Sequence, residues 1–400
     1  MRARSLWTLL VLAGILAAAW PGRAAAVPVF ARKYGFQCTM CHSNMPRLND
    51  FGARYRMNGY RLPGRESEEK TVLQSPAPVA LRTSVGYTGA DRNDAAGGGC
   101  ESDFRLNGLD LLSAGTLGPK IGYFMVYLPQ IGEARGVAPQ DGALEMASVV
   151  FSGLAGSWLN LRAGRFEPAF VPFSVKRQLG VAPYEVYDYS FPAGPLLSET
   201  RSGVEAAGYG SNRFQYAAGV VTGSETNRPY DTPSDVYARA AYVVGPGEGQ
   251  TAGQRLGLVG YLGRARPADE LGGPTSLEPF YRAGVDASLN AAHVNLALQY
   301  LWSRDDQNLW GAVDAVTYSG GFAELSVLPA VNLVGFARFD LVQAPDVDGR
   351  DITRWTAGGR YYAVDNVALH LEYSHRKLAD VTATDDAVES FVTARVDFAF

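Results

Sequence analysis

The chain is poor in cysteine, in histidine and in long apolar runs. Its 400 residues include three cysteines and four histidines, and three cysteines are too few for a disulfide framework. No stretch beyond residue 26 has the eighteen consecutive apolar residues expected of a membrane-spanning helix. Basic and acidic residues nearly balance, at 36 and 40, which gives no argument for a nucleic-acid partner. Glycine and tyrosine, in contrast, are plentiful at 45 and 21, as suits a β-rich protein with many turns and aromatic belts.

Residues 1–26 are typical of a secretory signal peptide. Arg2 and Arg4 form the basic region, and residues 6–20 form an apolar run. The alanines at 24–26 fit a small-residue cleavage site, which makes Val27 the expected mature N-terminus. An uncleaved anchor is the alternative, but the apolar run is short and rich in alanine. The sequence therefore predicts export from the cytoplasm.

Cys38, Cys41 and His42 form a C-x-x-C-H motif, the signature of covalent haem c attachment. Two thiols at this spacing bond to the two vinyl groups on one porphyrin edge, and the histidine is held as an axial ligand of the iron. A redox pair or half a zinc site is the alternative. No second C-x-x-C exists, and the only other cysteine, Cys100, is far away. The motif predicts one haem c, in agreement with the export signal.

Residues 27–75 form the predicted haem segment. Pro46 can stand in the first turn of a helix, apolar residues recur after it at helical spacing, and Asn58 with Gly59 is a stop signal. We therefore expect one short helix over 46–58 that packs on the porphyrin. Because a segment of this length has a thin core, the haem would supply much of its buried apolar surface.

From residue 76 to residue 400 the hydrophobic period changes to two, as in a β-strand. A soluble sandwich would also alternate, but many strands of about ten residues with aromatic ends are typical of a transmembrane barrel. The sequence thus predicts an all-β, antiparallel barrel of about sixteen strands with the haem segment plugging its lumen. The expected strands are 78–89, 104–114, 121–130, 144–154, 157–163, 201–209, 213–223, 235–245, 254–263, 278–288, 292–302, 310–327, 331–342, 352–363, 366–375 and 388–400.

The connections between these strands alternate between short and long, which is the expected asymmetry of periplasmic turns and external loops. An even strand count puts both ends of the barrel domain on the periplasmic side, so the haem segment would enter from there. The longest connection, 164–200, is rich in proline and aromatic residues. We expect it to fold inward and narrow the lumen, with an external flap as the alternative.

The sixth ligand of the haem iron is open between three residues. Met57, at the end of the predicted helix, has the reach to fold over the porphyrin and is our choice, although ordinary helix packing explains it as well. By the strand alternation, His293 and His370 point into the lumen. Polar lining of the lumen is the simpler explanation of both, but either could bind the iron of a haem segment that plugs the barrel.

The stretches 28–35, 38–42, 46–52 and 59–60 resemble the fused monohaem cytochrome–porin family, whose best-known members are outer-membrane iron oxidases of iron-oxidising bacteria. The order of signal, single haem segment and porin-like barrel is similar too. The resemblance implies that Cys38 and Cys41 carry the haem and that His42 binds its iron. It further implies electron transfer across the outer membrane of a Gram-negative bacterium, with extracellular Fe(II) or Fe(III) and periplasmic c-type cytochromes as partners and lipid around the barrel.

Two functions follow as expectations. The first is an electron conduit, in which one haem in a barrel passes electrons between extracellular iron and periplasmic cytochromes, with Fe(II) oxidation as a possible enzyme activity. The second is a porin for small solutes or anions whose haem segment acts as a plug or redox gate.

Overall fold

The computed structural model describes residues 29–36, 40–42, 45–65, 69–74, 78–93, 98–132, 137–191, 194–210, 213–225, 228, 232–245, 254–267, 277–364, 366–379 and 387–399. The predicted signal peptide and Cys38 lie outside the described residues. Among the helices of these residues, none is long and apolar enough to cross a membrane.

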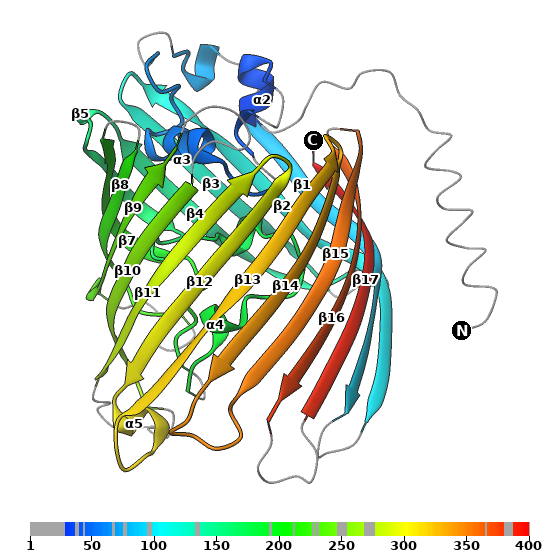
Figure 1. Ribbon diagram of the computed structural model, residues 1–400. Coiled ribbons are helices and arrows are strands. Elements are labelled where there is room, and N and C mark those ends of the chain that lie inside the picture. Colours follow the sequence, from blue (N-terminus) through cyan, green and yellow to red (C-terminus); the bar gives the residue numbers. More distant parts are fainter. Residues whose placement is uncertain are drawn as a thin grey trace.

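In the described part of the chain, sixteen antiparallel strands form a closed barrel (Figure 1). Each strand pairs with its neighbours in sequence, and β1 pairs with β17 to close the ring. The barrel strands are β1 (Val79–Asn93), β2 (Gly99–Gly118), β3 (Ile121–Ile131), β4 (Gln140–Phe151), β6 (Asn160–Phe166), β7 (Arg201–Gly210), β8 (Phe214–Val221), β9 (Asp235–Val244), β10 (Gln254–Ala265), β11 (Glu278–Ala291), β12 (Val294–Asp305), β13 (Val316–Ala330), β14 (Leu333–Gln343), β15 (Ile352–Val364), β16 (Val367–Leu378) and β17 (Ala387–Ala399). The short β5 (Leu154–Ser157) stands outside this ring, since β4 pairs directly with β6. The predicted all-β barrel is confirmed.

Side chains alternate between the lumen and the outer surface along each strand. In β12, Asn295 and Gln299 are buried inside, whereas Trp302 is exposed on the outside. Every strand of a closed barrel has a partner on both edges, so its backbone groups are paired and the apolar exterior can face lipid. The alternation predicted for 292–302 is confirmed, except that the strand begins at Val294.

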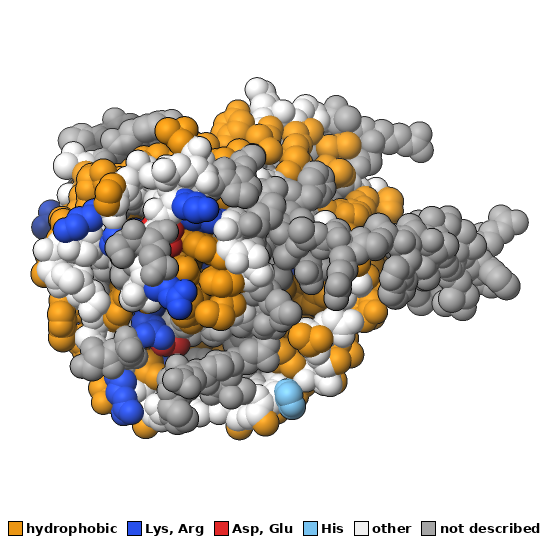
Figure 2. All heavy atoms as spheres, turned by 90° about the horizontal axis from the view of Figure 1, so that it is seen from above, with side chains coloured by type: hydrophobic (Ala, Val, Ile, Leu, Met, Phe, Trp, Pro, Cys, Tyr) orange, Lys and Arg blue, Asp and Glu red, His pale blue; other side chains and the backbone are white. Residues whose placement is uncertain are grey.

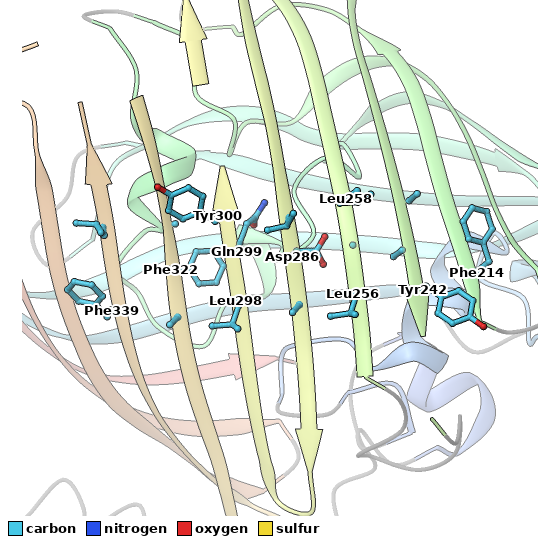
Figure 3. A pocket seen from close by; sticks show the side chains of 18 residues that line it. Phe214, Tyr242, Leu256, Leu258, Asp286, Leu298, Gln299, Tyr300, Phe322 and Phe339 are labelled. Carbon is cyan, nitrogen blue, oxygen red and sulfur yellow. The ribbon is translucent and has the colours of Figure 1, made fainter. Parts of the chain in front are cut away.

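A shallow depression of about 930 Å³ lies on this outer wall (Figure 3). The exposed side chains of Phe214, Tyr242 and Leu256 contribute to its lining. Because these side chains are apolar and face outward, the depression belongs to the lipid-facing surface and not to the lumen.

The N-terminal segment lies at the end of the barrel that carries the short turns (Figure 1). It contains α2 (Val29–Tyr34), α3 (Asp50–Met57) and the 3-10 turn η3 (Val72–Gln74). The helix predicted over 46–58 starts later, at Asp50. The reason is the side chain of Asn49, which accepts a hydrogen bond from the Gly52 amide at 2.8 Å and so caps the helix.

The connection 167–200 folds into the barrel, as predicted. It contains the 3-10 turn η4 (Val175–Arg177) and α4 (Glu185–Asp188), which packs against β13 and β14. On the barrel wall, Glu185 forms an ion pair with Arg354 at 2.7 Å and accepts a hydrogen bond from Arg376 at 2.9 Å. We call residues 167–200 the inserted segment. At the far end of the barrel, α5 (Gln307–Trp310) lies between β12 and β13.

Candidate haem-attachment site

His42 is held in place by contacts of both its backbone and its ring. Its backbone pairs with Leu48, and its Nδ1–H donates a hydrogen bond to the Pro46 carbonyl oxygen at 2.8 Å. This bond places the ring proton on Nδ1 and leaves the lone pair of Nε2 for a metal. Burial lowers the pKa of His42 to about 4, so the imidazole is neutral at physiological pH. Both features fit an axial ligand of haem iron.

Cys41 is fixed against the start of α3. The Asn49 amide donates to the Cys41 carbonyl oxygen at 2.9 Å, and Gly52 lies so close that a Cβ there would overlap with this carbonyl. Cys38 lies outside the described residues. The donor set of the motif fits haem c. Cys41, together with Cys38, would form the thioether bonds, and His42 would supply the axial nitrogen.

A small aromatic core holds the segment together. The Phe30 ring lies 5.1 Å from the rings of both Tyr55 and Tyr60, measured between centroids. Tyr60 in turn stacks on Phe124 of β3 at 5.7 Å. Tyr55 and Tyr60 are buried. This core is small, in agreement with the expectation of thin packing, and it joins the segment to the barrel wall.

Polar contacts dock the segment inside the mouth of the barrel. Arg47 is buried, donates to Asn295 of β12 at 3.1 Å and to Tyr184 of the inserted segment at 3.2 Å, and forms an ion pair with Glu324 of β13. Further round the wall, Gln215 of β8 donates to Asp50 at 2.5 Å.

The backbone of the segment also contacts the barrel wall. The Tyr362 hydroxyl of β15 donates to the Met45 carbonyl oxygen at 2.9 Å, and Gly59 packs directly on Gly122 of β3. The segment therefore contacts several sides of the inner wall. Figure 2 looks onto this end of the barrel and shows Lys and Arg side chains gathered on it, with little exposed acidic surface.

Met57 lies on the face of α3 that lines a cavity together with Arg56 and Arg177. Gly52 and Tyr55, on the other face of the helix, lie close to Cys41. Arg177 is close enough to His42 to contribute to its lowered pKa. Met57 as the sixth ligand of the iron stays a prediction.

The two alternative ligands differ in their surroundings. His370 is buried in the lumen, where Arg360 Nε donates to its Nδ1 at 3.1 Å and its Nε2 bonds to Glu372 Oε2 at 3.1 Å. Both ring nitrogens thus have protein partners. His293 lies in the exposed turn between β11 and β12 and not in the expected strand.

The sequence did not reveal two cavities inside the barrel. One, of about 140 Å³, lies between α3 and the inserted segment. The other, of about 400 Å³, lies along the wall formed by β1, β2 and β15–β17, and its lining includes Arg82, Lys176, Arg360 and Arg395. The alternation of residues along each strand shows which positions face the lumen. It does not show which strands face each other across the lumen, so the sequence did not predict the cavities.

Comparisons with known proteins concern the barrel. No protein-family model matches the chain, and no curated protein matches it. Among solved structures, an anion-selective porin from Comamonas acidovorans is similar, with a TM-score of 0.56, 15% identity, and coverage of 80% of this chain and 99% of that one.

Two further structures agree with this likeness. The outer membrane channel DcaP of Acinetobacter baumannii has a TM-score of 0.54 at 12% identity, covering 82% of this chain and 99% of its own. OmpF of Salmonella typhi, in complex with daunomycin, has a TM-score of 0.55 at 10% identity, covering 80% and 97%. At these identities the likeness concerns architecture, and the fold of this chain is the sixteen-strand barrel of the outer-membrane porins.

Proposed function

We propose that this protein is an outer-membrane electron conduit, in which one haem c held by Cys38, Cys41 and His42 sits in the mouth of the barrel. The observation that carries the proposal is the hydrogen bond from His42 to Pro46, in a C-x-x-C-H segment docked inside a transmembrane barrel. A bound haem would supply one-electron exchange between its ferric and ferrous states. Extracellular iron is the proposed partner on one side and periplasmic c-type cytochromes on the other.

The protein's own residues would determine how such a haem is reached. The hydrocarbon layer is roughly 30 Å thick and holds no electron carriers. The docked segment lies within one mouth of the barrel, and the buried Arg47–Glu324 pair fixes it to the wall. The inserted segment fills the lumen beyond it with buried aromatic residues, including Tyr184 and Tyr187. This filling favours electron transfer over free passage of solutes.

Haem staining on a denaturing gel tests the attachment. The wild-type chain should keep its haem after denaturation, because thioether bonds are covalent. The double variant Cys38→Ala, Cys41→Ala should lose the stained band while the barrel still assembles, and Cys100→Ala should keep it. Haem that stays attached in the double variant would overturn the assignment.

A porin with the N-terminal segment as plug or gate is the second candidate. It is favoured by the cavity of about 400 Å³ along the wall. The lining holds four basic residues, Arg82, Lys176, Arg360 and Arg395, and two acidic residues, Asp110 and Asp397. A cavity with this excess of basic residues would suit small anions. Leakage of small anions from liposomes that contain the wild-type protein would support this function over the conduit.

A further inference from the structure

The cavity between α3 and the inserted segment is lined mainly by basic groups. Six arginines line it, and they come from the N-terminal segment, the inserted segment and three barrel strands. They are Arg47, Arg56, Arg162, Arg177, Arg239 and Arg255. Among the lining residues that the structure describes, Glu205 is the one carboxylate. Such convergence from distant parts of the chain is unusual for solvated surface arginines and indicates a built site.

Two of these arginines each pair with a buried carboxylate that no other arginine of the cavity shares. Arg47 pairs with Glu324, and Arg162 pairs with Glu205. Both carboxylates are fully buried, with no exposed side-chain surface. These two charges are therefore balanced by the protein itself.

The other four arginines share two carboxylates. The shared pairs are Glu167 with Arg177 at 2.9 Å and Arg56 at 3.7 Å, and Asp286 with Arg239 at 2.8 Å and Arg255 at 3.7 Å. These six arginines thus pair with four carboxylates. The nearby Asp50 is itself paired with Arg54 at 3.0 Å, so the cluster keeps two positive charges in excess. Removing charge from water without compensation is costly, so an additional anion would stabilise this cluster.

Two buried hydrogen-bond donors of this cluster also lack an acceptor among the described residues. Nε of Arg239 and Nε of Arg255 are buried and, within the described residues, have no hydrogen-bond acceptor. Most buried polar atoms have a partner in the protein or in ordered water. Two unsatisfied guanidinium donors beside a cavity with excess positive charge point to an oxygen-rich anion as the missing acceptor.

We propose that this cavity binds a dianion through its arginines, either two carboxylates or one phosphate-like oxyanion. Two sources have this chemistry. One is the pair of propionate carboxylates of a haem attached at the neighbouring motif, since Leu48 both lines the cavity and pairs with His42; this source rests on the proposed function. The other is a free oxyanion that enters the barrel.

The test uses the purified full-length protein and two measurements. Calorimetric titration with inorganic phosphate measures binding of a free oxyanion, and a redox titration gives the midpoint potential of the haem. The variant is Arg239→Gln with Arg255→Gln. The matched control is Arg105→Gln, which removes an exposed arginine of β2 that does not line the cavity.

If the cavity binds a free oxyanion, phosphate should bind to the wild type and to Arg105→Gln. The double variant should bind phosphate roughly tenfold more weakly or not at all. If the cavity binds the haem propionates, phosphate should not bind to the haem-loaded protein. The midpoint potential should then be lower in the double variant than in the control, because the loss of positive charge favours ferric iron. The proposal is wrong if phosphate does not bind and the double variant has the potential of the control. If haem staining shows that no haem is attached, the proposed function fails, and phosphate binding alone still decides the proposal for the cavity.

Discussion

Gly52 is the residue that allows the attachment motif to pack on α3. A Cβ at this position would overlap with the Cys41 carbonyl oxygen. We therefore expect Gly52→Ala to displace Cys41 from the helix and to reduce the amount of haem bound per protein. The ratio of haem absorbance to protein concentration measures this loss.

The control for Gly52→Ala is Gly118→Ala, because nothing lies within 4 Å of a Cβ at Gly118. This control should keep the wild-type haem content. Equal haem content in both variants would contradict the packing of Cys41 on Gly52.

Arg47 joins the N-terminal segment to the barrel wall through a buried ion pair with Glu324. Removing one partner of a buried ion pair typically costs about 3–5 kcal/mol, because the other charge stays buried without a partner. We expect Arg47→Gln to release the segment and to accelerate its limited proteolysis by roughly a hundredfold or more, as cleavage follows the population of the released form. The rate of cleavage between the segment and the barrel is the measurement.

Glu324→Gln in the Arg47→Gln background provides the matched comparison. Since neither side chain is then charged, the double variant should recover part of the protection. The effects of the two single variants on the cleavage rate can also be multiplied. If the double variant is cleaved at the rate that this product gives, the two residues act independently.

Gly122 of β3 is a point where the segment and the barrel wall pack closely. Gly59 packs on it without room for a Cβ. Gly122→Val should therefore push the segment out of the mouth while leaving the barrel intact. We expect the conductance of planar bilayers that contain the variant to rise above that of the wild type.

Gly260→Val is the control on the wall, because Gly260 of β10 has open space where a Cβ would stand. It should leave the conductance unchanged. No difference between the two variants would mean that the segment does not close this mouth.

The strands were predictable because a single rule governs them. Apolar and polar residues alternate wherever one face meets lipid and the other the lumen, so β12 and β16 match the expected strands to within three residues at either end. The start of α3 was not predictable, because the cap at Asn49 competes with Pro46 as a signal for the start of a helix. The inward fold of the inserted segment followed from its length and its aromatic residues.

The orientation of the barrel in the membrane can be tested with cysteines at its two ends. Asn308 of α5 is exposed at the end with the long connections, and Val331 is exposed in the turn between β13 and β14. In a Cys100→Ser background, Asn308→Cys should react with a membrane-impermeant maleimide on intact cells. Val331→Cys should react only after the outer membrane is opened, and the reverse pattern would invert the topology.

The arginine cavity could not be predicted, because it is a property of the closed molecule. Arg162, Arg239 and Arg255 stand on separate strands, and Arg56 and Arg177 come from other elements. Each is an ordinary polar position on its own. Only closure of the barrel and docking of the N-terminal segment bring them together. No local sequence pattern specifies the curvature of the sheet or the docked position of the segment.

Electron transfer across a membrane that contains only this protein would distinguish a conduit from a pore. Sealed proteoliposomes enclose a redox dye in its oxidised form and receive Fe(II) outside. The dye should be reduced in vesicles with the wild-type protein, while an enclosed small anion does not leak. Vesicles with Cys38→Ala, Cys41→Ala should show no reduction. Leakage of the anion without reduction of the dye would contradict the conduit and identify the protein as a pore.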